Sequence, residues 1–375
     1  MIRLPLIKPD IDFSEVEKDF RSIFASGTLT RGRYVECFER AVAKYLGIEF
    51  AFATTSATTA LHLSLIALGI GRGDEVLVSD FTFPASGNAI VQTGAVPVLV
   101  DCAPGRFDFD ASDAVSKVSP KTKAIMAVSP FGQPCNSMEL QDFSKAHDIP
   151  VIEDAACSLG AVRNGTKSGA WSELACFSFH PRKVITTGEG GMVVTNSARL
   201  AEKIQILRNH GANATSDGIS FIESGFNYRL SELQAAMGLS QMHKIDAIID
   251  DRRRSAKLYI KHLTDILPEI TIPLCADIEE CSFQSFVVML PEACSQQKII
   301  TALRDRQIET TLGTYAMHSH PAFSRYGYHI GELKNSYLAQ GRSLTLPIIP
   351  RMRQEDIHRV VSELKECLSV LNCHT

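Results

Sequence analysis

Apolar and polar positions along the first two thirds of the chain follow two alternating patterns, one typical of buried strands and one typical of helices. Short apolar runs that indicate strands occupy residues 50–54, 75–79, 96–101, 124–129 and 150–154. Helical patterns occupy residues 14–25, 34–46, 58–68, 84–93, 111–118 and 137–147. Because strands and helices alternate, the chain predicts an α/β fold with a mostly parallel central sheet flanked by helices. Such sheets bind ligands at the carboxyl ends of their strands.

The pattern changes near residue 245, where a charged helical segment at 250–257 follows the last alternating elements. Beyond it the chain predicts strands at residues 285–290 and 344–349 and helices at 297–306 and 354–371. These elements are more widely spaced than those before them. We therefore expect a large domain of residues 1–245 and a smaller C-terminal α+β domain of residues 246–375.

The composition of the 375 residues is that of an ordinary globular protein, with 45% hydrophobic and 21% charged residues. The formal net charge of −4 and the absence of a basic block argue against nucleic acid or an anionic membrane as a partner. The N-terminal residues lack an apolar signal-peptide core and no run is long enough to span a bilayer, so we expect a cytoplasmic protein. The ten cysteines form no Cys-x-x-Cys pair, which favours reduced thiols over disulfides or metal ligands.

A lone lysine, Lys183, lies between two apolar runs in the segment from Cys176 to Asn196, just before a glycine-rich turn at 186–191. A lysine at the end of a buried strand is partly desolvated, which lowers the pKa of its amine and makes it a candidate Schiff-base nucleophile. The alternative is a solvated lysine in a surface loop, since charged side chains are seldom buried. The neighbouring strand ends help to decide between these interpretations.

Three further strand ends carry side chains that suit a planar, phosphorylated cofactor. Ser56 precedes a helix whose dipole and free amides at Thr58 and Thr59 form a candidate phosphate site, although capping alone also explains this sequence. Asp154 ends a buried strand and either holds a protonated ring nitrogen or caps the next turn. Phe83 either stacks on a planar ring or packs in the core. With the lysine, these residues meet the requirements of pyridoxal 5′-phosphate.

Seven short motifs occur in one order along the chain: Ser26–Gly32, Gly69–Val76, Phe81–Phe83, Glu153–Ala156, Ser178–Lys183, Gly188–Gly191 and Gly225–Arg229. Their sequences and order resemble those of the DegT/DnrJ/EryC1/StrS family, the sugar-nucleotide aminotransferases of fold type I. The resemblance runs almost from end to end, and the combination of motifs is specific although each motif alone is not. A branch of 3-dehydratases resembles the same family but carries histidine at the position of Lys183, so the lysine favours an aminotransferase.

The resemblance implies a role for each residue of the predicted cofactor site. It makes Lys183 the Schiff-base lysine, Asp154 the partner of the pyridinium nitrogen and Phe83 the stacking ring. It assigns the cofactor phosphate to Thr58, Thr59 and Ser178. With the freed amine, Lys183 would also serve as the acid and base that moves the substrate proton.

Two further residues of the cofactor site rest on the resemblance alone. Asn227 would reach the phosphate in the site of a neighbouring subunit, which implies a homodimer with shared active sites. Taken by itself, Asn227 after Gly225 is typical of a turn residue. Cys157 stands where many family members have Gln or His beside the cofactor, so its contact with the cofactor is an open question.

Four residues are candidates for binding the substrate. Thr30 lies in the segment that resembles the family's entry loop, and Arg229 either meets a substrate carboxylate or phosphate or pairs with Glu232. His318 and His320 lie in the family's substrate-facing segment, where they either contact the sugar or diphosphate or cap a turn. The sequence His-Pro-Ala-Phe that begins at His320 resembles members that aminate C4 rather than C3 of a keto-deoxysugar.

The sequence therefore predicts a PLP-dependent aminotransferase that moves an amino group from an amino acid, L-glutamate first, to a ketone of a nucleotide-linked deoxysugar. One alternative is a non-catalytic PLP-binding regulatory protein of the same fold, although the chain shows no additional DNA-binding domain. Another is a nucleotide-binding oxidoreductase, suggested by the glycines of Gly188–Gly191. That interpretation lacks the Gly-x-Gly-x-x-Gly spacing between a strand and a helix.

Overall fold

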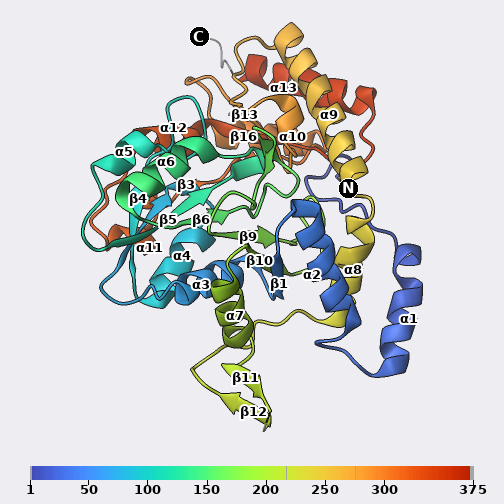
Figure 1. The fold of residues 1–375 in the computed structure, drawn as a ribbon. Coiled ribbons are helices and arrows are strands. Elements are labelled where there is room, and N and C mark those ends of the chain that lie inside the picture. The colour runs from blue at the N-terminus through green and yellow to red at the C-terminus, as the bar shows by residue number, and fades with distance from the viewer. Residues whose placement is uncertain (1, 217, 275, 372–375) are drawn as a thin grey trace.

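A seven-stranded sheet forms the centre of the molecule, and helices cover both of its faces (Figure 1). The computed structural model describes residues 2–216, 218–274 and 276–371. The sheet has the order β1–β10–β9–β6–β5–β2–β4, with strands β1 (Phe50–Thr54), β2 (Glu75–Ser79), β4 (Val96–Val100), β5 (Thr122–Val128), β6 (Val151–Asp154), β9 (Leu174–Ser178) and β10 (Gly191–Thr195). All neighbours from β9 to β4 are parallel, whereas β10 is antiparallel to both β9 and β1. The predicted mostly parallel sheet is confirmed.

The helices of this part of the chain are α1 (Glu17–Ser26), α2 (Arg33–Leu46), α3 (Ala57–Ala67), α4 (Ala85–Thr93), α5 (Ala111–Val115), α6 (Ser137–His147), α7 (Ala198–Leu207) and α8 (Glu232–Met242). Because successive strand residues point to opposite faces, the sheet separates these helices into two layers. Val76 and Val78 of β2 pack in a cluster with α3, α4 and α7, while Leu77 packs in a cluster with α5 and α6. A further cluster joins α2 and α8 to β1, β9 and β10.

The remaining helices are α9 (Ile245–Ile266), α10 (Gln296–Asp305), α11 (Pro321–Ser324), α12 (Lys334–Arg342) and α13 (Gln354–Val370). Strands β13 (Phe286–Met289), β16 (Ser343–Leu346) and β14 (Thr311–Leu312) form a second, antiparallel sheet in that order. Residues of α9, α10, α13 and this sheet share one hydrophobic cluster, which also includes Leu4. The charged segment at 250–257 is thus the middle of a much longer helix, and the domain boundary at residue 245 stays a prediction.

Several short elements were not predicted from the hydrophobic pattern. Strand β3 (Phe81–Thr82) pairs with β15 (Tyr315–Ala316), and β7 (Val162–Arg163) pairs with β8 (Thr166–Lys167). Strands β11 (Ala212–Thr215) and β12 (Gly218–Phe221) form a hairpin that projects from the body of the molecule (Figure 1). The 3₁₀ turns are η1 (Phe13–Glu15), η2 (Pro130–Gly132), η3 (Ile278–Glu280) and η4 (Met317–Ser319). The pairing of β3 with β15 places a C-terminal segment at the edge of the predicted cofactor site.

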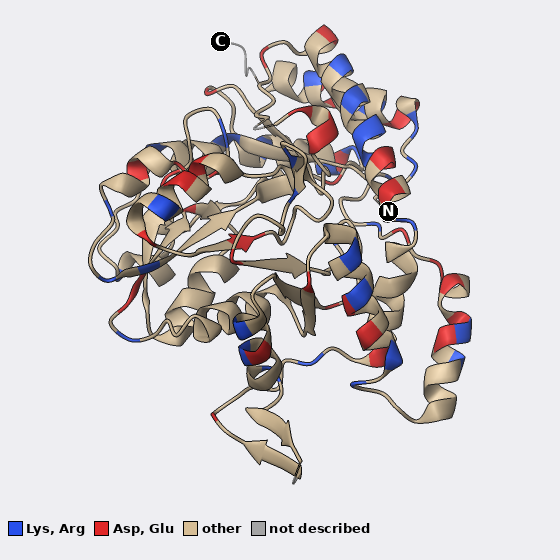
Figure 2. Cartoon of the chain, viewed as in Figure 1, with Lys and Arg blue, Asp and Glu red and all other residues tan. Residues whose placement is uncertain are grey.

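Charged residues lie mainly on the outer helices, above all on α1, α2 and α9, and are sparse on the strands of the central sheet (Figure 2). None of the described helices is both long and apolar enough to cross a bilayer. The described cysteines have free thiols, and most of them are buried. Cys275 and Cys373 lie outside the described residues.

Candidate active site

Lys183 lies in the turn that joins β9 to β10, at the carboxyl end of β9. This turn is closed by a hydrogen bond of 2.9 Å from Phe179 N to Gly190 O. A Cβ on Gly191 would lie 2.3 Å from the carbonyl carbon of Ser56, so only glycine lets the start of α3 pack against the turn. The end of the turn that carries Lys183 therefore lies against the start of the predicted phosphate helix.

The Lys183 side chain meets the residues that follow β6. Its Nζ donates a hydrogen bond of 3.0 Å to the Sγ of Cys157, which comes three residues after Asp154 at the end of β6. The Asp154 carboxylate is 5% exposed and accepts hydrogen bonds from Ser86 Oγ at 2.7 Å and Ala156 N at 3.2 Å. Burial raises the pKa of Asp154, while these hydrogen bonds and the charge of Lys183 oppose the rise.

Ser86 of α4 is a residue that sequence reasoning missed. Its hydroxyl orients the Asp154 carboxylate, although the two residues are far apart in the sequence and a serine near a helix start is usually only a cap. The only available signal was its position three residues after Phe83. The contact connects the segment that carries Phe83 to the end of β6.

Glu153, the neighbour of Asp154, points to the other face of the sheet and is fully buried. Its carboxyl group accepts hydrogen bonds from Ser129 Oγ at 2.6 Å and from Gly169 N at 2.7 Å. Burial raises the pKa of Glu153 to about 7, against the opposing effect of these hydrogen bonds. Glu153 therefore anchors the two loops that carry its donors, and Asp154 is the carboxylate that faces Lys183.

The start of α3 is fixed by a capping box. Ser56 Oγ accepts from Thr59 N at 3.1 Å, and Thr59 Oγ1 accepts from Ser56 N at 3.0 Å. This corrects the expectation that the Thr58 and Thr59 amides are both free, because the Thr59 amide is used by the cap. Among the described residues, the Thr58 amide has no hydrogen-bond acceptor, and it remains available to an anion at the positive end of the helix.

Phe83 directly follows β3, and 66% of its surface is exposed, which is unusual for a large aromatic side chain. Its ring lies 6.3 Å from that of Tyr315 on the paired strand β15, and Tyr315 lies 5.4 Å from the ring of His320. The His320 Nε2 is 3.1 Å from Gln340 Oε1. The C-terminal segment therefore places an aromatic row beside the open face of Phe83.

His318 does not offer a free ring nitrogen to a substrate, which corrects the expectation that it contacts the sugar. Its side chain is fully buried, and its Nδ1 donates to Asp80 Oδ2 at 2.6 Å. Its Nε2 accepts from Gly331 N at 3.2 Å and lies 3.2 Å from Ser319 Oγ. Both nitrogens are thus occupied, and the ring holds the C-terminal segment against the residue that follows β2.

The other predicted residues lie at the end of β9 and in two β-bridges. Ser178 ends β9 and its Oγ accepts from His180 N at 3.4 Å. The exposed Asn227 forms a β-bridge with Asn209, and Thr30 forms one with Ser231. In the part of the chain that the structure describes, no hydrogen bond joins Asn227 or Thr30 to Lys183.

Arg229 does not pair with Glu232, contrary to one of the two predicted interpretations. Its Nη1 donates to the amide oxygen of Asn209 at 2.8 Å. Glu232 instead accepts hydrogen bonds from three backbone amides at the start of α2, those of Gly32, Tyr34 and Val35. Arg229 therefore keeps its charge available for another anion.

The residues around Lys183 fit pyridoxal 5′-phosphate. Asp154 is a buried carboxylate, and among the described residues no Lys, Arg or His nitrogen lies within 4 Å of it. A buried charge of this kind needs a positive partner, and a protonated ring nitrogen is such a partner. The exposed ring of Phe83 and the free end of α3 suit the planar ring and the phosphate. The fold and these residues define a PLP-dependent aminotransferase of fold type I.

The family is shown by comparison with known proteins. Residues 10–365 match the model of the DegT/DnrJ/EryC1/StrS aminotransferase family, and the chain belongs to this family. It is similar to the GDP-perosamine synthase of Caulobacter vibrioides, with 36% identity over 98% of each chain. Its structure resembles that of S. venezuelae DesV, with 30% identity, a TM-score of 0.90 and 98% of each chain covered. It also resembles a PMP-form structure of Spr1654, a sugar aminotransferase of Streptococcus pneumoniae, with 25% identity, a TM-score of 0.91 and 98% of each chain covered.

These findings decide between the interpretations left open by the sequence. The chain is a sugar aminotransferase with pyridoxal phosphate as its cofactor, which disfavours a non-catalytic regulatory protein. The glycines of 188–191 lead into strand β10 and not into a helix, so they do not form a dinucleotide-binding turn. The oxidoreductase interpretation is therefore wrong.

Proposed function

We propose that this protein transfers the amino group of L-glutamate to the C4 keto group of a nucleotide-linked 6-deoxysugar. The observation that supports this most directly is the buried Asp154 carboxylate, which has hydrogen-bond donors but no Lys, Arg or His nitrogen within 4 Å among the described residues, and which feels the charge of Lys183. The similarity to a GDP-perosamine synthase supports GDP as the nucleotide. The choice of C4 over C3 follows the sequence of the 320–323 segment.

When bound, pyridoxal phosphate draws electrons from the α-carbon of the donor and carries the amino group to the acceptor. Asp154 opposes the positive charge of the ring nitrogen and so keeps a proton there. Lys183 attaches the cofactor and moves the α-carbon proton with its Nζ. The Cys157 thiol, 3.0 Å from this nitrogen, restricts where the free amine points.

The remaining residues of the site hold and orient the cofactor and the acceptor sugar. The Thr58 amide and the Ser178 hydroxyl bind the cofactor phosphate at the positive end of α3, and the capping box through Thr59 fixes that end. Phe83 covers one face of the ring and excludes water from it. His320, which is held by Gln340, faces the acceptor sugar.

We also propose that the working unit is a homodimer with shared active sites. The β11–β12 hairpin projects from the molecule (Figure 1), and Ile219 and Phe221 on it are 68% and 69% exposed. An isolated two-stranded hairpin with apolar side chains in water is only marginally stable, so a second copy of the chain is expected to cover it. Asn227 follows this hairpin and would then reach the partner's cofactor phosphate.

Complementation tests the shared site. Inactive Lys183→Ala and Asn227→Ala proteins, unfolded and refolded together, should yield mixed dimers in which one site has both native residues. Recovery of activity on mixing would support the shared site. No recovery from verified mixed dimers, or a monomeric wild-type protein in light scattering, would contradict it.

Two separate half-reactions test the proposed activity. The PLP-loaded protein should convert L-glutamate to 2-oxoglutarate in a single turnover, with a matching change in cofactor absorbance, and D-glutamate is the control. The aminated protein should then aminate GDP-4-keto-6-deoxymannose, with UDP- and dTDP-linked 4-keto sugars compared in parallel and the product position read by NMR. Amination at C3, or of none of the sugars, would overturn the proposal for the acceptor without affecting that for the donor.

A further inference from the structure

The described cysteines differ in how far they are exposed. Most of them are buried, and burial raises the pKa of Cys102 and Cys281 to about 12 and also raises that of Cys176. Such thiols react slowly, because the thiolate is the reactive form of cysteine. Among the described cysteines, only Cys37 and Cys157 are partly exposed.

Both of these thiols accept a hydrogen bond from a basic side chain, but the two donors differ in their chemistry. Lys183 Nζ donates to Cys157 Sγ at 3.0 Å, and Arg40 Nη2 donates to Cys37 Sγ at 3.2 Å. A lysine amine is a nucleophile once it has lost its proton, whereas a guanidinium stays protonated in proteins. The sulfur of Cys157 is therefore in contact with a nitrogen that can form a covalent bond to it.

Two turns of the backbone keep this sulfur and this nitrogen together. Ser158 N donates to Ala155 O at 3.0 Å, which closes a turn around Cys157. On the opposite side of the contact, Lys183 N donates to His180 O at 2.9 Å. A cysteine side chain has a single rotatable bond before its sulfur, so the backbone largely decides where the sulfur lies. The two atoms are thus positioned for a reaction with each other.

We propose that Cys157 and Lys183 form a modification site, at which a peroxide joins the two side chains through a sulfur–nitrogen bond. First, the thiol attacks hydrogen peroxide: the O–O bond breaks, the sulfur is oxidised to a sulfenic acid, and water leaves. Then the Lys183 Nζ attacks the sulfur: the S–N bond forms, the S–O bond breaks, and the hydroxyl leaves as water with one proton of the amine. One thiol, one amine and one peroxide thus give one sulfenamide and two waters. Sulfenic acids condense with neighbouring backbone nitrogens in the same way.

The link occupies the amine that attaches the cofactor. A nitrogen bonded to sulfur and to the Lys183 Cε has one proton left, and it cannot form a double bond to the aldehyde carbon of pyridoxal phosphate. This consequence rests on the proposed role of Lys183, whereas the link itself depends only on the contact between the two atoms. Thiols reverse the link: one thiol attacks the sulfur and releases the amine, and a second reduces the mixed disulfide and restores Cys157.

The state of the cofactor decides when the link can form. While the cofactor is attached to Lys183, the amine is not available, and oxidation of Cys157 stops at the sulfenic acid. In the pyridoxamine phosphate form the amine is released and can attack the sulfur. The protein is therefore most sensitive to peroxide in the part of its cycle in which Lys183 is free.

Peptide mass spectrometry of the protein loaded with pyridoxamine phosphate tests the link without a measurement of activity. After a short treatment with hydrogen peroxide in mildly alkaline buffer, the peptides of Cys157 and Lys183 should appear as a joined pair, two hydrogen atoms lighter than their sum. Dithiothreitol should separate the pair again. The same treatment of the PLP-loaded protein should give much less of it.

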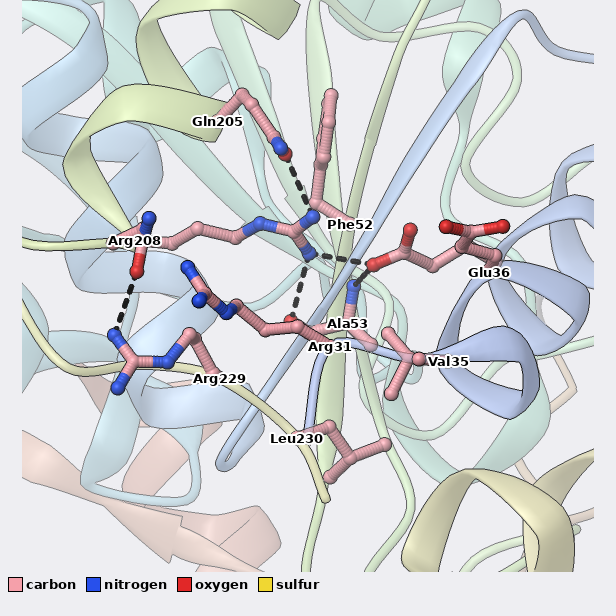
Figure 3. A pocket seen from close by; sticks show the side chains of 12 residues that line it. Arg31, Val35, Glu36, Phe52, Ala53, Gln205, Arg208, Arg229 and Leu230 are labelled. Atoms are coloured by element: carbon pink, nitrogen blue, oxygen red, sulfur yellow. Dashed lines mark hydrogen bonds and ion pairs between the residues drawn. The ribbon is translucent and has the colours of Figure 1, made fainter. Parts of the chain in front are cut away.

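The other partly exposed thiol supplies the matched control. Cys37 lies on α2, whose residues Glu36 and Glu39 line a pocket of about 540 Å³ (Figure 3). Neither Cys157 nor Lys183 lines this pocket, so Cys37 reports on oxidation in another part of the molecule. The Cys37→Ser protein should form the link as the wild type does, and the Cys157→Ser protein should form none. Unchanged melting temperatures verify that both variants are folded.

A third variant separates oxidation from linking. In Lys183→Arg, Cys157 should still be oxidised, as a dimedone adduct shows, but no joined pair should form. In the wild type loaded with pyridoxamine phosphate, a Cys157 that stays reduced, or that stops at a sulfenic, sulfinic or sulfonic acid, would overturn the proposal. So would an equal yield of the link in the PLP-loaded protein. If the link forms and the linked protein keeps its amino transfer, the modification site stands and the proposed role of Lys183 is wrong.

Discussion

Two buried aspartates, Asp80 and Asp154, each come at the end of a parallel strand, and their surroundings differ in one respect. Asp80 follows β2 and is closed by His318, whose ring and backbone amide both donate to it, at 2.6 and 2.8 Å. Asp154 ends β6 and receives two hydrogen bonds but no cation within 4 Å among the described residues. The chain itself supplies a histidine ring as partner for the Asp80 carboxylate, whereas Asp154 has no such partner among the described residues.

The difference shows how a structural charge can be told from a functional one. A buried carboxylate whose hydrogen bonds are made within the chain holds segments together, as Asp80 and His318 hold the C-terminal segment at β2. A buried carboxylate without a positive partner disfavours the ligand-free fold and gains when a cation binds. Asp154 with Lys183 therefore fits the proposed cofactor site, whereas both ring nitrogens of His318 already have partners within the chain.

The largest effect should come from removing the amine of Lys183, which faces Asp154. Lys183→Ala is expected to lower the rate of amino transfer by about 10⁴-fold or more, because both the attachment of the cofactor and the proton transfer are lost. Single-turnover rates with L-glutamate measure this change. Lys334→Ala, at the start of α12 and remote in sequence from the site, serves as the control and should be near wild type. A Lys183→Ala protein with wild-type turnover would show that another group does this chemistry.

Removing the contact between His318 and Asp80 should lower the stability of the fold and leave amino transfer unchanged. His318→Ala removes the ring that donates to the buried Asp80 carboxylate and leaves the backbone amide of residue 318 as its donor, which we expect to destabilise the fold by about 3 kcal/mol. Urea denaturation of wild type and variant measures the difference. The KM for the sugar should stay within a few fold in protein that remains folded. A large rise in KM without loss of stability would contradict this prediction and indicate that His318 contacts the substrate.

A smaller, pH-dependent effect should follow from Asp154→Asn. Burial raises the pKa of Asp154 above its unfolded value of 3.8, so the contribution of this group to the stability of the cofactor-free wild type is greatest below pH 3.8 and is lost as pH rises through the raised pKa. The cofactor-free Asn variant should not show that loss, although it should transfer amino groups about a hundredfold more slowly because nothing opposes the charge of the ring nitrogen. Melting temperatures between pH 3 and 8 measure the first effect. If the melting temperatures of the two proteins changed with pH in the same way, Asp154 would be ionised without a loss of stability.

The local pattern of the sequence predicted much of the fold. The strands at 50–54 and 75–79 were predicted with their observed bounds, and Ser56 caps α3 as its sequence indicates. Such features depend on near neighbours, so a chain segment is enough to determine them. The two-residue strands β3 and β15 were not predicted, because only their pairing with each other stabilises them. The helices α7, α8 and α12 were also missed, since their segments were not singled out by periodicity.

The sequence by itself determined the family through the order of its motifs, and it predicted the lysine at a strand end and the aspartate after an apolar run as the residues that carry the chemistry. Only the tertiary structure decided which carboxylates already have a partner. Among the described residues, it placed His318 against Asp80 and left Asp154 with no Lys, Arg or His nitrogen within 4 Å. The physical reason is that the free energy of a charge depends on every group within a few ångströms of it, and most of those groups come from distant parts of the chain.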